Sequence, residues 1–248
     1  MIENVFIPCD DDGEFLNVAL FNAATGFEFL GHPVTRMTGD EILGRTARPQ
    51  DLVFGGVDAV RPYLAKLGCE PLPIDYPDAV LPSLKRTFSK STLREIRRLY
   101  NEPGDPVFIK PVEHKLFTGH TVRRFGDLLR TQNLDADTPI YVVEHVEFVS
   151  EWRFYIEGQE VVGVDHYKGD PCKFPHPTDP KETAVRWSKH PEPPPAAYSL
   201  DFGVRKDGET CLVEVNDMIS LGCYGLDAPV YARLIIARWL QLVESLLP

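Results

Sequence analysis

The sequence lacks the features typical of secreted proteins, proteins with structural zinc and membrane-spanning proteins. Its five cysteines, at positions 9, 69, 172, 211 and 223, are odd in number and form no Cys-x-x-Cys pair, which argues against a disulfide framework and structural zinc. The start, MIENVFIPCDDDGEF, has neither the basic nor the apolar region of a signal peptide. Three charged residues, Arg233, Arg238 and Glu244, interrupt the most apolar segment, 230–247, so we expect a buried amphipathic helix there.

An excess of basic residues is also lacking. The 248 residues include 26 Lys and Arg against 37 Asp and Glu, a formal net charge of −11. Nucleic-acid binding usually depends on a basic patch that neutralises phosphates. We therefore expect a cytoplasmic protein that binds no nucleic acid and no membrane and whose polar partner is a small molecule. The sequence leaves open whether the chain forms a homodimer.

The tripeptide Asp201-Phe202-Gly203 matches the magnesium-binding string of protein kinases. A kinase would also need a Gly-rich loop near the N-terminus and a His-Arg-Asp loop upstream, and the sequence contains neither string. The kinase interpretation therefore fails, and Asp201 requires another explanation.

A hairpin is predicted around that aspartate. Asp207-Gly208 is a strong two-residue turn signal, and alternating apolar runs flank it. The resulting register sets Asp201 opposite Glu214 and Ser199 opposite Asn216. Because side chains alternate along a strand, the two acids and the amide share one face. The other face is apolar and is expected to cover a core, with the members Leu200, Phe202, Val204, Val213 and Val215.

Directly opposed carboxylates need a compensating charge or free access to water. Their Cβ atoms would lie roughly 5 Å apart, where two negative charges repel by about 3 kcal/mol at an effective dielectric constant near 20. Magnesium, which prefers carboxylate, amide and phosphate oxygens, would offset that repulsion. The alternative is a solvated polar face whose acids diverge into water. The hairpin alone does not decide between them.

A proline-rich segment, 69–82, divides the chain. Before it, alternating elements predict an N-terminal α/β lobe, residues 1–80, with strands NVFIP, FEFL and DLVF and helices near 15–24 and 57–67. The second part, 81–248, is predicted to contain a helix near 91–100 capped by Ser91, a strand VFIK, a helix near 122–130, a strand IYVVEH and a hairpin turning near Gly158. We expect residues 171–195, rich in proline and charge, to be exposed and partly irregular. The fold class is α/β (α+β).

The order and spacing of three stretches resemble the ATP-grasp superfamily of ATP-dependent carboxylate–amine ligases. They are VFIKP, VVEHVEFVSE and the D-x12-E-x-N pattern in LDFGVRKDGETCLVEVN, and the resemblance extends from about Leu81 to Leu226. It implies an ATP-grasp fold with a small lobe at 81–145 and a metal-binding lobe at 146–248, preceded by the N-terminal lobe. Nucleotide would bind between the two ATP-grasp lobes.

The resemblance also implies roles for individual residues. The nucleotide would be bound by Lys110 at the α and β phosphates, Glu144 and the backbone of Val146 at the adenine, and Glu151 at the ribose. Lys85 is a looser candidate for a second phosphate lysine. The phosphate loop is poor in glycine, so either Lys115 or His114 would assist it or the loop is a lid that becomes ordered only with nucleotide. One or two Mg²⁺ ions would be coordinated by Asp201, Glu214 and Asn216.

An arginine is expected to stabilise charge on the transferring phosphoryl group. We expect Arg153 in this role, with Arg205 as second choice, although an exposed structural arginine is an equal interpretation of either. Many superfamily members carry an arginine two residues before the metal aspartate, whereas this chain has Ser199. Substrate contacts are expected from 171–195, with Lys173 and Arg186, and from the turn at 222–225.

The activity that the resemblance implies is a ligase reaction. ATP would phosphorylate a small-molecule or peptide carboxylate, and an amine would displace the phosphate to form an amide. A small-molecule kinase of the same fold and a non-catalytic ATP-binding scaffold are the alternatives.

Overall fold

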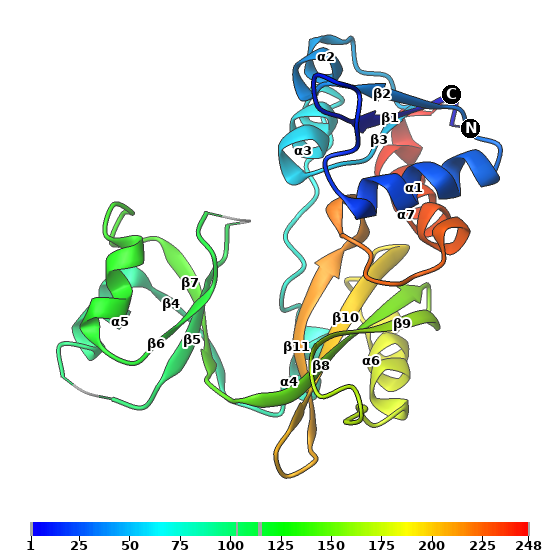
Figure 1. Cartoon of the computed structure of the whole chain (residues 1–248). Coiled ribbons are helices and arrows are strands. Elements are labelled where there is room, and N and C mark those ends of the chain that lie inside the picture. The colour runs from blue at the N-terminus through cyan, green and yellow to red at the C-terminus, as the bar shows by residue number, and fades with distance from the viewer. Residues whose placement is uncertain (1, 103, 114–115, 248) are drawn as a thin grey trace.

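The computed structural model describes residues 2–102, 104–113 and 116–247, and it has three lobes, each built on one sheet (Figure 1). The N-terminal lobe contains a parallel sheet of order β2-β1-β3. The small lobe has the antiparallel order β4-β7-β5-β6, and the central sheet has the antiparallel order β11-β10-β8-β9. The functional residues predicted above therefore belong to two different sheets.

The N-terminal lobe alternates strands and helices, as its sequence predicts. Its elements are β1 (Asn4–Pro8), α1 (Val18–Phe29), β2 (Val34–Met37), α2 (Gly39–Gly44), β3 (Asp51–Val53) and α3 (Val57–Lys66). The Asn17 side chain caps α1 by accepting hydrogen bonds from the backbone N–H groups of Ala19 and Leu20. The predicted strand FEFL is wrong, because its first three residues end this helix. Phe27 is fully buried there, and Gly26 lies so close to Ala228 that a Cβ would clash; packing outweighs the β preference of the local sequence.

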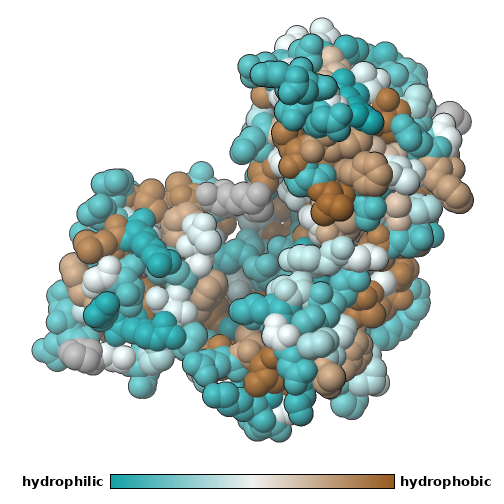
Figure 2. All heavy atoms as spheres, viewed as in Figure 1, coloured by the Kyte–Doolittle hydropathy of each residue, from teal (hydrophilic) through white to brown (hydrophobic). Residues whose placement is uncertain are grey.

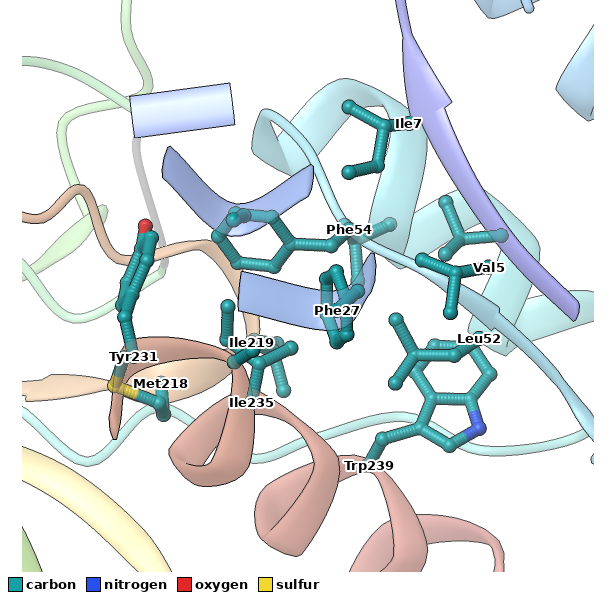
Figure 3. Packing of buried hydrophobic residues seen from close by; sticks show 14 of the residues in the cluster. Val5, Ile7, Phe27, Leu52, Phe54, Met218, Ile219, Tyr231, Ile235 and Trp239 are labelled. Carbon is teal, nitrogen blue, oxygen red and sulfur yellow. The ribbon is translucent and has the colours of Figure 1, made fainter. Parts of the chain in front are cut away.

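Helix α7 (Ala228–Val243) returns from the far end of the sequence to the N-terminal lobe. Figure 3 shows its Ile235 and Trp239 near Phe27 and Leu52, and all four are buried. Its buried Tyr231 lies edge-on to Phe54, with ring centroids 5.6 Å apart. The predicted buried helix at 230–247 is therefore confirmed. Among the described residues, no helix is both long and apolar enough to cross a membrane. This helix adds to the core of the N-terminal lobe, which also contains buried residues of α1 and α3, because hydrophobic surface on the short sheet needs a second layer.

The small lobe follows a connection made of the 3-10 turn η1 (Asp78–Val80) and the short helix α4 (Leu81–Leu84). Its elements are β4 (Phe88–Thr92), α5 (Leu93–Leu99), β5 (Val107–Pro111), β6 (His120–Val122), the 3-10 helix η2 (Phe125–Thr131) and β7 (Pro139–Glu144). Ser91 as the cap of α5 is wrong, because Ser91 lies in β4 and Thr92 forms a capping box with Glu95. The predicted helix near 122–130 is the 3-10 helix η2.

The central sheet contains β8 (Phe148–Glu157), β9 (Glu160–Gly169), β10 (Ala197–Arg205) and β11 (Thr210–Asp217). Both predicted hairpins form, and the pairs Asp201 with Glu214 and Ser199 with Asn216 are confirmed. A register shift after Asp201 then pairs Phe202 with Leu212. The core position predicted for Val213 is wrong for this reason, because the bulge turns the buried Leu212 toward the core instead.

The segment predicted to be irregular contains a helix, α6 (Thr178–Ser188). Its Ala184 and Trp187 are buried against the core of the central sheet. These tertiary contacts stabilise the helix, which the proline-rich flanking sequence does not predict. Two further 3-10 turns, η3 (Met218–Ser220) and η4 (Glu244–Leu246), flank α7.

Candidate functional site

A cavity of about 420 Å³ lies between the small lobe and the central sheet. Figure 2 shows this face of the molecule hollowed between the small lobe on the left and the rest of the chain. Phe108 and Thr121 of the small lobe and Val146 from the connection to β8 line it, together with Asp201 and Glu214 of the central sheet. The predicted metal hairpin thus faces the predicted nucleotide strands.

Asp201 forms a bidentate ion pair with Arg153, and both residues line this cavity. The guanidinium Nε and Nη2 atoms donate to the two carboxylate oxygens over 2.9 and 2.7 Å. The two residues are opposite each other on β10 and β8 and are almost fully buried, with exposed fractions of 1% and 6%. Burial raises the pKa of Asp201, and although burial opposes the charge of Arg153, its bond to Asp201 raises the arginine pKa. Arg153 therefore compensates the buried carboxylate.

Lys110 near the end of β5 links the small lobe to the hairpin of β10 and β11. Its Nζ donates to Glu214 Oε2 over 2.8 Å and forms a second ion pair with Asp75. Burial alone would lower the pKa of Lys110, yet the two carboxylates raise it above its ordinary value. For Glu214, burial favours the neutral form, but Lys110 lowers the net pKa, so the carboxylate is charged at neutral pH. The lysine and the acid predicted from separate motifs are in direct contact.

Asn216 completes the predicted metal set. Its Nδ2 atom lies 3.4 Å from Asp201 Oδ2 and 3.5 Å from Ser199 Oγ. Two carboxylates and an amide supply hard oxygen donors of the kind that Mg²⁺ prefers, so the residues present fit this ion. No cluster of three or more His, Cys, Asp or Glu suited to a metal exists within the described ranges. The third protein ligand would therefore be the Asn216 amide.

Glu151 is buried and already engaged in the structure. Tyr167 Oη donates to its Oε2 over 2.9 Å, and Lys168 forms an ion pair with its other oxygen. Tyr167 stacks on Tyr224 with ring centroids 5.1 Å apart, and the Arg153 guanidinium lies 5.0 Å from the Tyr224 centroid. A hydroxyl-binding role for Glu151 would require it to exchange one of these partners. The turn at 222–225, predicted to contact substrate, brings Tyr224 to the cavity wall.

Arg86, which the sequence did not predict as a site residue, lies in the cavity wall. The residue before it, Lys85, is the predicted second phosphate lysine. Lys85 has the left-handed backbone angle φ 49° and pairs with Asp179 over 3.1 Å, away from the cavity. Arg86, which follows Lys85 in the chain, therefore points toward the cavity. Arg86 Nη2 donates to the carbonyl oxygens of Leu212 and Val213 over 3.0 Å, while its buried Nε has no hydrogen-bond partner among the described residues. Burial lowers the pKa of Arg86, and an anion would satisfy the unpaired donor.

The connection between the lobes places Val146 in the cavity wall but not Glu144. The Glu144 carboxylate accepts a hydrogen bond from the Thr87 backbone N–H over 3.0 Å, so it holds β4 against β7. His145 lines the cavity and lies 3.1 Å from both Thr121 Oγ1 and Arg123 Nη2. Burial and the Arg123 charge lower its pKa, which favours a neutral imidazole.

Several predicted residues lie away from this cavity. Arg205 is at the hairpin end, where it pairs with Glu209 over 3.1 Å. Lys173 is exposed, and Arg186 donates to the Ala79 carbonyl over 2.8 Å. Lys115 and His114 lie outside the described residues. Arg153 is thus the one of the two predicted arginines that reaches the cavity.

Solved structures resemble the whole chain. The D-cycloserine synthetase DcsG aligns with TM-score 0.59 and 11% identity over 95% of this chain and 99% of its own. The D-alanine–D-alanine ligase from Bacillus anthracis gives TM-score 0.59 and 13% identity over 99% of both chains. A RimK domain ATP-grasp protein from Sphaerobacter thermophilus gives TM-score 0.51 and 14% identity over 95% of this chain and 97% of its own. These likenesses confirm the predicted mixed α/β, ATP-grasp fold.

A comparison with curated proteins found no match. The family model described as the ATP-grasp domain, R-2-K clade family 2, matches residues 84–234, which is more than half of the chain and includes both the small lobe and the hairpin of β10 and β11. The chain therefore belongs to family 2 of this clade of ATP-grasp domains.

Proposed function

We propose that this protein is an ATP- and Mg²⁺-dependent ligase that joins a carboxylate to an amine. A carboxylate oxygen of the substrate attacks the γ phosphorus, the bond to ADP breaks, and an acylphosphate forms. The amine nitrogen then attacks the acyl carbon, phosphate leaves, and the nitrogen loses a proton to give the amide. The carboxylate and amine belong to small molecules or peptides.

One observation carries this proposal: Lys110 of the small lobe donates a hydrogen bond to Glu214, which lines the cavity between the lobes together with Asp201. Asn216 lies beside Asp201. Cationic and metal-binding groups on both sides of one cavity can bind a polyphosphate. Membership of the ATP-grasp family supports the same nucleotide, and the D-alanine–D-alanine ligase neighbour has also been solved with ATP.

The side chains divide the work of phosphoryl transfer between them. Lys110 and the unpaired Nε of Arg86 bind phosphate oxygens, and the backbone at Val146 borders the adenine. Asp201, Glu214 and Asn216 would hold Mg²⁺, which would supply positive charge to neutralise the phosphates. Arg153 favours the charged form of Asp201, against the effect of burial, and fixes the orientation of its carboxylate through two hydrogen bonds. The lobes exclude water from an acylphosphate, which would otherwise hydrolyse.

Calorimetric titration with the non-hydrolysable analogue AMP-PNP tests the proposal. We expect binding that requires Mg²⁺, followed in assays with ATP by ADP release that requires both a carboxylate and an amine. ADP release with an alcohol alone would show a small-molecule kinase, and binding without any turnover would show a scaffold. Absence of AMP-PNP binding with and without Mg²⁺ would contradict every ATP-dependent function.

Asp75 is expected to hold Lys110 in place. Asp75→Asn removes one of the two carboxylates that raise the lysine pKa, so that pKa should fall. Because the folded pKa lies above the ordinary value, the contribution of the ion pair to stability is complete at pH 7 and is lost only as the pH rises through the folded pKa. We expect D75N to lower the free energy of unfolding at pH 7 by roughly 1–3 kcal/mol in urea. The exposed Asp78→Asn is the control; an equal effect of both would contradict the role of Asp75.

A further inference from the structure

A second cavity, of about 90 Å³, lies between the N-terminal lobe and the end of β11. Arg61 of α3 forms one wall, and the connecting segment contributes Asp75. Asn216 and Ser220 form the side that belongs to the central sheet and the turn after it. This cavity is separate from the nucleotide cavity in its lining residues, yet Asn216 belongs to the candidate metal set and Asp75 bonds to Lys110.

Arg61 brings an unsatisfied donor to this cavity. Its Nε atom is buried and has no hydrogen-bond partner among the described residues, and no carboxylate described by the structure lies within ion-pair distance of its guanidinium. The two acids that line the cavity are engaged elsewhere, Asp75 by Lys110 and Asp217 by Arg238 over 2.6 Å. A buried guanidinium donor without an acceptor is costly, and an anion would satisfy it.

The remaining walls are apolar and define the rest of the ligand. Leu72, Ile74, Val215, Ile219 and Leu221 surround the space beside Arg61. A neighbouring cavity of about 430 Å³ shares Arg61 and Leu72 and has Glu70 and Glu113 in its wall. The arrangement fits an anionic head at Arg61 with an apolar body beside it. A planar guanidinium fork suits a carboxylate, which it can bind through two parallel hydrogen bonds.

We propose that this cavity binds the carboxylate substrate, an acid with an apolar body, through Arg61. The inference rests on the proposed ligase function and adds the substrate class and the residue that selects it. Asn216 faces both the candidate metal ligands and the second cavity. A carboxylate bound there therefore lies next to the group that would hold the Mg²⁺ of the phosphoryl donor.

NMR titration of the full chain labelled with ¹⁵N-arginine tests this site. The probes are acetate, isovalerate and phenylacetate, each compared with its neutral amide, and the Arg61 Nε resonance is assigned by its loss in Arg61→Gln. We expect at least one acid, and no amide, to shift this resonance in the parent. In R61Q the affinity for that acid should fall about tenfold or more, as expected for loss of a charge-assisted bidentate contact.

Two further variants make the result specific. The exposed Arg45→Gln in the same lobe serves as the matched control and should keep the parent affinity. Arg61→Lys retains the charge but not the planar fork and should fall between the parent and R61Q, which keeps the test decisive if R61Q folds poorly. Equal acid binding by the parent and the Arg61 variants, or no binding of any acid to the parent, would overturn the proposal.

Titration with Mg·AMP-PNP separates this inference from the ligase proposal. R61Q is expected to bind Mg·AMP-PNP as the parent does, since Arg61 does not line the nucleotide cavity. Acid binding without nucleotide binding would defeat the ligase proposal but retain the carboxylate site. Nucleotide binding without acid binding at Arg61 would retain the ligase proposal but defeat the carboxylate site.

Discussion

Glu214→Gln is expected to weaken Mg²⁺-dependent nucleotide binding severely while the protein stays folded. Glutamine has the shape of glutamate but lacks its negative charge, which strengthens the binding of a hard divalent cation. The fold should survive because Lys110 retains its ion pair with Asp75 when Glu214 is lost. Calorimetry with AMP-PNP should show affinity reduced by about a hundredfold in the presence of Mg²⁺, and circular dichroism should show an unchanged fold.

Glu209→Gln is the matched control, because it makes the same change on the same hairpin at the exposed ion pair with Arg205. This variant should bind Mg·AMP-PNP as the parent does. If E214Q also bound it normally, the hairpin would not be the metal site. Unfolding of E214Q would show that the carboxylate supports the fold. In that case Glu214→Asp, which keeps the charge on a shorter side chain, would decide whether the hairpin is the metal site.

The hairpin of β10 and β11 could be predicted from sequence because its determinants are local. The Asp207-Gly208 turn sets the register, and the strand period of two then places Asp201, Glu214 and Asn216 on one face. The bulge after Asp201 was not predictable in this way, since it depends on how Phe202 and Leu212 pack in the core. As a result the two acids were placed correctly and Val213 was not.

Residues that reach the site from irregular segments were missed for a physical reason. Asp75 lies in a proline-rich connection, where no strand or helix period predicts the direction of a side chain. Arg86 follows Lys85 directly, and the left-handed backbone at Lys85 decides which of the two cations faces the cavity. That conformation is unusual for a residue other than glycine, so the sequence favours neither.

The predicted strand FEFL shows that contacts distant in sequence can override a local preference. Its aromatic residues favour a strand locally, yet the segment ends α1 because Phe27 packs with α7, about 200 residues later. Contacts of such sequence separation are absent from any local pattern. The same holds for Arg153, whose partner Asp201 is 48 residues away and whose role became visible only in the paired strands.

Arg153→Leu is expected to have the largest effect on stability. It would leave the Asp201 carboxylate, 1% exposed, without its bidentate partner. Removing one member of a buried ion pair typically costs about 3–5 kcal/mol, because the remaining charge is neither solvated nor paired. We therefore expect R153L to lower the free energy of unfolding by that amount at pH 7, measured in urea.

The pH dependence of R153L should identify the cause. Burial already raises the pKa of Asp201, and Arg153 opposes that rise. Without the arginine the folded pKa rises further, so the carboxyl group binds more protons folded than unfolded. The protonated Asp201 then contributes fully to the free energy of unfolding at pH values below its unfolded pKa, and this contribution is lost as the pH rises through its folded pKa. The deficit of R153L relative to the parent should shrink as the pH falls toward about 4.

The double variant Arg153→Leu, Asp201→Leu separates a stranded charge from lost packing. Replacing both members of a buried ion pair by apolar residues is often neutral or stabilising, so the double variant should regain most of the stability that R153L loses. It should nevertheless fail to bind Mg·AMP-PNP, since it lacks a proposed metal ligand. If the double variant were as unstable as R153L, the arginine would act through packing against Tyr224 and not through the charge of Asp201. Recovery of stability without nucleotide binding would assign the pair to function, with Arg153 maintaining a buried carboxylate that the fold itself does not need.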